Sequence, residues 1–194
     1  ISTVQLYTQQ LTFDKTFGEH HINAIAVYEY QGQKTKQENS SGNQQSNDLT
    51  TLNNAGNVSV QTLVGENSLI SYLGRINYDY KGKYLLSGAI RRDGLSVWAT
   101  GKKWATFPSG SIGWRIDQEN FMKNLVWIND LKLRGSIGTA GSRANVPGNN
   151  AFSTYSSGLS TGAYSYNGLT LVNGFYQSQL GNPKTHWESD KISN

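Results

Sequence analysis

Cysteine is absent from the 194-residue sequence, and charged residues make up only 15% of it. The lack of cysteine excludes disulfides, thiolate metal sites and cysteine nucleophiles. The longest unbroken apolar run is the five residues 24–28, far below the roughly 20 that a membrane-spanning helix needs. The hydrophobic fraction of 36% lies below the roughly 45–50% of ordinary globular domains, and glycine and small polar residues fill the difference.

The charged residues give no sign of a nucleic-acid-binding surface. Lysine and arginine number 17 against 13 acidic residues, a net charge of +4, and the doublets Arg91-Arg92 and Lys102-Lys103 are not part of a basic helix. We therefore expect no nucleic-acid partner. The sequence opens at Ile1 without an initiator methionine or a signal peptide, so we expect an interior piece of a longer protein.

Alternation of apolar and polar residues is the dominant pattern. Residues 70–81 place Ile76 and Tyr78 on one parity and Arg75 and Asn77 on the other. The same alternation recurs over residues 22–30, 84–91, 104–116 and 131–137. Half-buried antiparallel strands give this pattern, so the sequence predicts an all-β fold. Tyr80 and Tyr84 keep a common face only if residues 81–83 form a three-residue turn with a positive φ at Gly82 or its neighbour.

The connections between these strands alternate in length. Short links cover residues 14–20, 81–83 and 117–129, and the others cover 31–69, 93–103 and 139–185. Short turns at one end and long loops at the other are typical of an outer-membrane barrel, whose strands need about 9–11 residues. The long links are then extracellular and residues 117–129 periplasmic.

Aromatic residues gather on the apolar parity, mostly toward strand ends, where interfacial belts of a barrel lie. They are Tyr28, Tyr30, Tyr78, Tyr80, Tyr84, Trp104 and Trp114. The alternative is a soluble β-sandwich binding module, for instance for carbohydrate, in which the same residues form a core.

Several motifs follow one another in a specific order. They are residues 72–86, Arg91-Arg92-Asp93-Gly94, Phe107-Pro108-Ser109, 113–116 and 128–138, with 11–18 upstream and 180–183 and Trp187-Glu188 downstream. In this order the sequence resembles the barrel of SusC/RagA-type TonB-dependent transporters. The resemblance covers most of the chain, apart from the long loops.

The resemblance implies about six to seven strands of a 22-stranded transmembrane barrel in the bacterial outer membrane. It implies an active importer of oligosaccharides or peptides that works with a SusD-like surface lipoprotein as its lid and with the TonB complex. Residues 1–194 are then a partial barrel domain, and the plug, the TonB-contacting segment and the signal peptide are expected outside this chain. Membrane lipid is the remaining expected partner.

Two sets of residues are candidates for function. The polar parity provides residues that would face the lumen and the plug: Arg75, Asn77, Asp79, Arg91, Arg115, Lys132 and Arg134. Alternatively these residues only solvate or cross-link the wall. The loops provide aromatic residues for contact with a ligand or the lid, or for internal packing: Trp98, Phe152, Tyr155, Tyr164, Tyr166 and Tyr176.

Nothing in the sequence points to catalysis. His20-His21 lacks the spacing of a metal site, and the glycines of residues 135–141 have neither the spacing nor the following helix of a dinucleotide loop. Asp117 and Glu119 form an acidic pair that nothing places across a cleft. We therefore expect no enzyme activity, no metal and no cofactor.

Overall fold

The computed structural model describes residues 1–44, 51–123, 127–142, 150–165 and 171–194. The strands in these residues are β1 (Ser2–Phe17), β2 (His20–Gln44), β3 (Ala55–Tyr80), β4 (Tyr84–Leu95), β5 (Trp104–Arg115), β6 (Lys132–Ser142), β7 (Thr154–Ser165), β8 (Leu171–Gln179) and β9 (Glu188–Ser193). Three short 3-10 turns accompany them: η1 (Leu52–Asn54), η2 (Ile116–Gln118) and η3 (Asn120–Met122). No helix in the described part is both long and apolar enough to cross a membrane.

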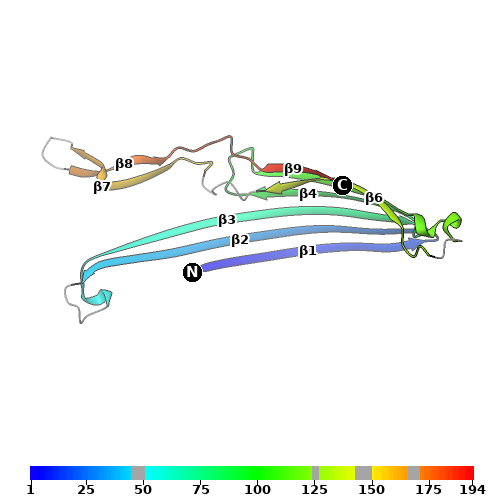
Figure 1. Ribbon diagram of the computed structural model, residues 1–194. Helices are drawn as coiled ribbons and strands as arrows, with labels where there is room; N and C mark the ends of the chain where they lie inside the picture. The colour runs from blue at the N-terminus through cyan, green and yellow to red at the C-terminus, as the bar shows by residue number, and fades with distance from the viewer. Residues whose placement is uncertain (45–50, 124–126, 143–149, 166–170) are drawn as a thin grey trace.

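Seven strands form one antiparallel sheet in the order β1-β2-β3-β4-β5-β6-β9, and β7 pairs with β8 (Figure 1). Strands that follow one another in sequence lie side by side in this sheet up to β6. The sheet does not close, and β1 and β9 are its two edges. The expected antiparallel all-β fold is therefore confirmed.

The turn between β3 and β4 has the predicted three-residue form. Tyr80 pairs with Tyr84, and both Lys81 and Gly82 take positive φ values, 58° and 64°. The Gly82 N–H donates to Asp79 Oδ1 at 2.6 Å, so the aspartate stabilises the turn. Glycine suits residue 82 because it adopts this left-handed conformation without the strain that a side chain causes.

Residues 31–69 differ from the expectation of a long loop. The ladder between β2 and β3 continues from Gln31–Leu69 to Gln44–Ala55, with one register shift between Ser41 and Asn43. The fourteen residues 31–44 extend about 46 Å at about 3.3 Å per residue, and Figure 1 shows them as a long projecting hairpin. The sequence pattern missed it because neither face of this part needs an apolar side chain, and backbone hydrogen bonds form the ladder.

The link 139–185 also contains more structure than expected. β6 continues to Ser142, and β7 and β8 form a second hairpin that lies toward the same end as the far part of β2 and β3 (Figure 1). The turns η2 and η3 lie at the opposite end of the sheet. The expected arrangement of large loops at one end and short turns at the other is kept, with both large loops partly built from strands.

The sheet has one apolar and one polar face. One cross-strand row of the apolar face joins Ala24, Ile76, Gly88 and Gly110 through the strand register. The neighbouring row of the polar face joins Asn23, Asn77, Ser87 and Ser111. A β-sandwich would cover the apolar face with a second sheet, and the other sheet in the described residues is the two-stranded β7–β8 hairpin. The structure therefore does not support the soluble β-sandwich.

Apolar packing is concentrated in one cluster at the loop end of the sheet. Leu95, Trp98, Phe107 and Trp187 are all buried there, with exposed fractions of 9% or less. The Trp187 Nε1–H donates to the carbonyl oxygen of Lys103 at 3.0 Å. The cluster fixes the loop between β4 and β5, and the segment before β9, against the sheet.

Candidate functional site

The polar face carries a chain of hydrogen bonds across β1, β2 and β3. His21 Nε2 lies 3.0 Å from Asp14 Oδ1, and the Asn23 amide donates to Asp14 Oδ2 at 2.8 Å. The Asn77 amide donates in turn to Asn23 Oδ1 at 3.3 Å. No third His, Asp or Glu joins Asp14 and His21 to form a metal site among the described residues. Parity placed Asn23 and Asn77 on this face, but it could not show the chain of hydrogen bonds, because which residues lie opposite one another depends on the register.

A groove of about 510 Å³ lies along this face toward the turn end. Asn77, Ser87, Lys132 and Arg134 are among the residues that line it. The Ser87 and Ser111 hydroxyl groups lie 2.6 Å apart at its floor. The groove thus offers neutral hydrogen-bonding groups beside two cations.

Three of the predicted polar-face residues are engaged within the wall. Asp79 accepts the turn hydrogen bond described above. Arg91 lies 2.9 Å from the Asp93 carboxylate and donates to the Ser71 hydroxyl at 3.3 Å. Arg115 lies 3.5 Å from Asp117. For these residues the structure shows cross-linking contacts within the wall.

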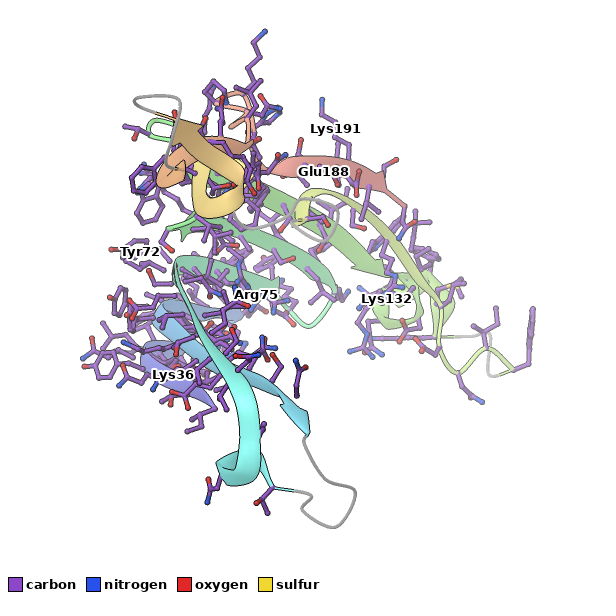
Figure 2. All side chains as sticks on the ribbon, turned by 90° about the vertical axis from the view of Figure 1, so that its left-hand side faces the viewer. Lys36, Tyr72, Arg75, Lys132, Glu188 and Lys191 are labelled. Carbon is purple, nitrogen blue, oxygen red and sulfur yellow. The ribbon has the colours of Figure 1, made fainter. Side chains whose placement is uncertain are left out.

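The other three cations on this face are available for external contacts. Arg75, Lys132 and Arg134 are exposed, and within the described part of the chain none of them has an ion-pair or hydrogen-bond partner. Figure 2 shows Arg75 and Tyr72 on opposite sides of β3. The arrangement leaves three positive side chains ready to bind carboxylates or carbonyl groups from outside this chain.

Two aromatic belts cross the apolar face. The loop-end belt consists of Tyr7, Tyr28, Tyr72 and Trp104, whose neighbouring ring centroids are 5.4–6.3 Å apart. The turn-end belt consists of His20, Tyr80, Tyr84 and Trp114, with the His20 and Tyr80 rings 4.8 Å apart. Tyr72 and Tyr80 are eight residues apart, or about 26 Å of strand. On strands tilted by about 40°, that length corresponds to a height of about 20 Å, which is close to the apolar band of about 25 Å in outer-membrane barrels.

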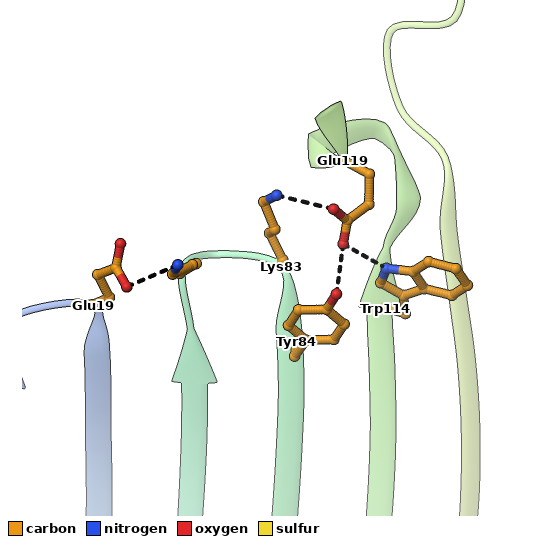
Figure 3. Close-up of polar contacts among 6 residues, drawn as sticks. Glu19, Lys83, Tyr84, Trp114 and Glu119 are labelled. Carbon is orange, nitrogen blue, oxygen red and sulfur yellow. Dashed lines mark hydrogen bonds and ion pairs between the residues drawn. The ribbon is translucent and has the colours of Figure 1, made fainter. Parts of the chain in front are cut away.

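Glu119 joins the turn between β5 and β6 to the turn-end belt (Figure 3). Its carboxylate accepts hydrogen bonds from the Tyr84 hydroxyl at 2.7 Å, Lys83 Nζ at 3.0 Å and the Trp114 indole at 3.2 Å. These three donors, the Tyr84 hydroxyl first, lower the pKa of Glu119 to about 2. The sequence showed Glu119 only as half of an acidic pair, and the structure gives it a role in fixing the turn.

Acid should loosen this turn before it disturbs the sheet. The pKa of Glu119 is about 2 when folded, below its ordinary value of 4.5, so its stabilisation is complete above about pH 4.5 and is lost as the pH falls toward 2. We expect amide exchange protection in residues 116–122 to fall over this range. The Glu119→Gln variant should start with lower protection and show a weaker dependence, because Asp117, whose pKa is also lowered, first by its hydrogen bond with Gln118, remains in this segment. Equal pH profiles in the two proteins would contradict this role.

The loop aromatics divide into buried and exposed residues. Trp98 is only 2% exposed, and its ring centroid lies 6.0 Å from that of Trp187. The prediction that Trp98 contacts a ligand or the lid is therefore wrong, because the cluster at the loop end buries its ring. Phe152 and Tyr155 are 47% and 67% exposed, and Tyr176 is half-buried. The Tyr164 side chain and Tyr166 lie outside the described residues.

Solved structures share this fold. The peptide transporter RagAB superposes with a TM-score of 0.83 at 21% identity, over 98% of this chain and 21% of that chain. Its "open-open" state gives a TM-score of 0.76 at 22% identity, over 98% and 20% of the two chains. No family model matches the sequence.

Curated sequences provide the decisive comparison. TonB-dependent receptor P3 of Formosa agariphila is 33% identical over 196 residues, which cover 98% of this chain and 19% of that protein. TonB-dependent receptor SusC of Bacteroides thetaiotaomicron is 44% identical over 75 residues, which cover 39% and 8%. The chain belongs to the SusC/RagA family of TonB-dependent receptors. A further relative in this family, TonB-dependent receptor P39 of Formosa agariphila, is 35% identical over 188 residues, covering 94% and 17%.

This SusC/RagA chain spans about a fifth of the length of the curated relatives that it matches. The family's members are outer-membrane β-barrel proteins, which agrees with the two aromatic belts and the open sheet. The predicted family and fold are therefore confirmed.

Proposed function

We propose that residues 1–194 form part of the barrel wall of a TonB-dependent importer in the bacterial outer membrane. The observation that carries this proposal is the two-faced sheet, with belts separated by about 26 Å along the strands on the apolar face and free cations on the polar face. The apolar face contacts lipid, and the polar face lines the lumen. The long hairpins are extracellular, and the turns η2 and η3 are periplasmic. The proposal assigns transport, and no catalysis, to this wall.

The free cations of the polar face suit contact with a plug. Arg75, Lys132 and Arg134 point away from the lipid side, and an arginine fork can hold a carboxylate or two carbonyl groups. A plug inside the barrel would supply such acceptors. Arg134 is the strongest candidate, because it also lines the 510 Å³ groove.

The cargo is an oligosaccharide or a peptide. RagAB is described as a peptide transporter, and this chain shares its fold. A SusD-like surface lipoprotein covers the extracellular end and contacts the exposed loop aromatics Phe152 and Tyr155 and the half-buried Tyr176. Deletion of residues 150–176 from the full-length protein should reduce pull-down of the lipoprotein. Coupling to the TonB complex runs through the plug.

Replacing Arg134 by alanine in the full-length protein should loosen the plug and leave the barrel folded. Loss of one charge-assisted contact exposes plug backbone, so we expect several-fold faster proteolysis of the plug and slower TonB-dependent uptake. Limited proteolysis in outer-membrane vesicles measures the first effect, and uptake by cells measures the second.

Arg134→Lys is the matched variant, because it keeps the charge and loses the fork. It should fall between the wild type and Arg134→Ala. Heat-modifiable migration in electrophoresis verifies that each barrel has folded. Unchanged plug cleavage in Arg134→Ala, with a folded barrel, would remove Arg134 from the plug contact.

A further inference from the structure

Arg92 is an unusual residue for a lipid-facing surface. It lies on the apolar face, where it pairs with Tyr72 of β3 and Thr106 of β5. Its guanidinium carbon is 5.2 Å from the centroid of the Trp104 ring. This ring lies so close over Gly94 that a Cβ there would be 2.7 Å from it. The lack of a side chain at Gly94 therefore leaves the space that the Trp104 ring occupies beside Arg92.

Arg92 is exposed and has no ion-pair partner among the described residues. By contrast, Lys34, which lies on the same face in the projecting part of the β2–β3 hairpin, is 2.6 Å from the Glu66 carboxylate. Aromatic belts lie at the level of lipid headgroups. Arg92 therefore places a positive charge at this level, where an anionic group from outside the described chain can bind it.

An apolar groove leads from Arg92 toward the middle of the apolar face. This outer groove has a volume of about 970 Å³. Its lining includes Leu11, Tyr28, Gly74 and Ile90 as well as Arg92. The strand register places Leu11 of β1 and Ile90 of β4 at its two sides, and Gly74 on the strand between them leaves the floor open. The two sides are three strand spacings apart, or about 14 Å. This width can hold acyl chains.

We propose that the outer groove binds a phosphate-bearing lipid of the outer leaflet. Its acyl chain lies over Gly74 between Leu11 and Ile90, and its phosphate accepts hydrogen bonds from the Arg92 guanidinium. The fork of donors matches phosphate oxygens, and Tyr28 and Tyr72 flank the chain where it leaves the headgroup. The inference rests on the proposed orientation of the wall, in which the apolar face contacts lipid.

Native mass spectrometry of the full-length protein in detergent tests this site with defined probes. We expect phosphatidylglycerol to remain bound to the wild type, and diacylglycerol with the same acyl chains to bind at least about tenfold more weakly, the factor expected from loss of one hydrogen bond to a charged group. Arg92→Gln should weaken phosphatidylglycerol by a similar factor, and Arg92→Lys by less. Gly74→Leu should weaken both lipids, because it fills the groove.

Lys102→Gln is the control, because Lys102 is an exposed cation in the loop between β4 and β5. It should leave lipid binding unchanged. Phosphatidylglycerol binding that is equal in Arg92→Gln and the wild type would overturn the proposal, as would inorganic phosphate that displaces the lipid at equal concentration. Heat-modifiable migration verifies folding of each variant. Loss of membrane insertion in the wild type would instead contradict the proposed barrel wall.

Discussion

An arginine in place of Ile76 should reduce assembly of the full-length barrel, whereas an arginine in place of its neighbour Asn77 should be tolerated. Ile76 lies between the two belts on the apolar face and is 51% exposed. An arginine at this depth on a lipid-facing surface costs about 2–4 kcal/mol. Asn77 lies on the polar face, and its loss removes one 3.3 Å hydrogen bond to Asn23.

The fraction of heat-modifiable protein in the outer membrane measures this difference. Ile76→Leu controls for the loss of the isoleucine itself and should assemble like the wild type. The result decides which face meets lipid. If Asn77→Arg reduces assembly and Ile76→Arg does not, the assignment of the two faces is reversed.

Replacing Trp187 by alanine should release the loop between β4 and β5. Trp187 is 9% exposed and packs edge-on against Phe107, with ring centroids 5.9 Å apart. Truncation of a buried tryptophan costs about 3–5 kcal/mol. The cost should appear locally, as faster hydrogen exchange at Leu95 and Lys102, whose amides bond within this loop to Lys103 and Ala99.

Trp127 offers a matched control. It is 76% exposed, so Trp127→Ala should leave exchange in this loop unchanged. Trp187→Phe keeps the aromatic packing and removes the hydrogen bond to Lys103, and it should have a smaller effect. Equal exchange at Leu95 in Trp187→Ala and Trp127→Ala would show that the cluster does not hold the loop.

Alternation was sufficient to predict the part of the sheet between the belts. It was sufficient there because each strand presents one face to an apolar environment and the other to polar groups. The three-residue turn at residues 81–83 also followed from this alternation. The projecting part of β2 and β3 could not be found in this way. Its side chains on both faces are mostly exposed, so no apolar period marks it.

The site residues were predictable only as members of a face. Parity correctly grouped Arg75 with Arg134, and applied to Arg92 it would have placed that residue on the apolar face. Parity could not show that Glu119 reaches Tyr84 or that Trp98 is buried. These contacts join residues through register and loop packing, which leave no local sequence signal.

The β2–β3 hairpin also has a mechanical consequence. Its strands run without interruption from the turn-end belt to the far end, and the ladder has one register shift, between Ser41 and Asn43. It therefore acts as a lever that is anchored in the wall. A tilt of about 10° at its base moves the far end by about 8 Å, given a projection of about 46 Å. In the proposed barrel wall, a small change in strand inclination would thus produce a large displacement at the far end of this pair of strands.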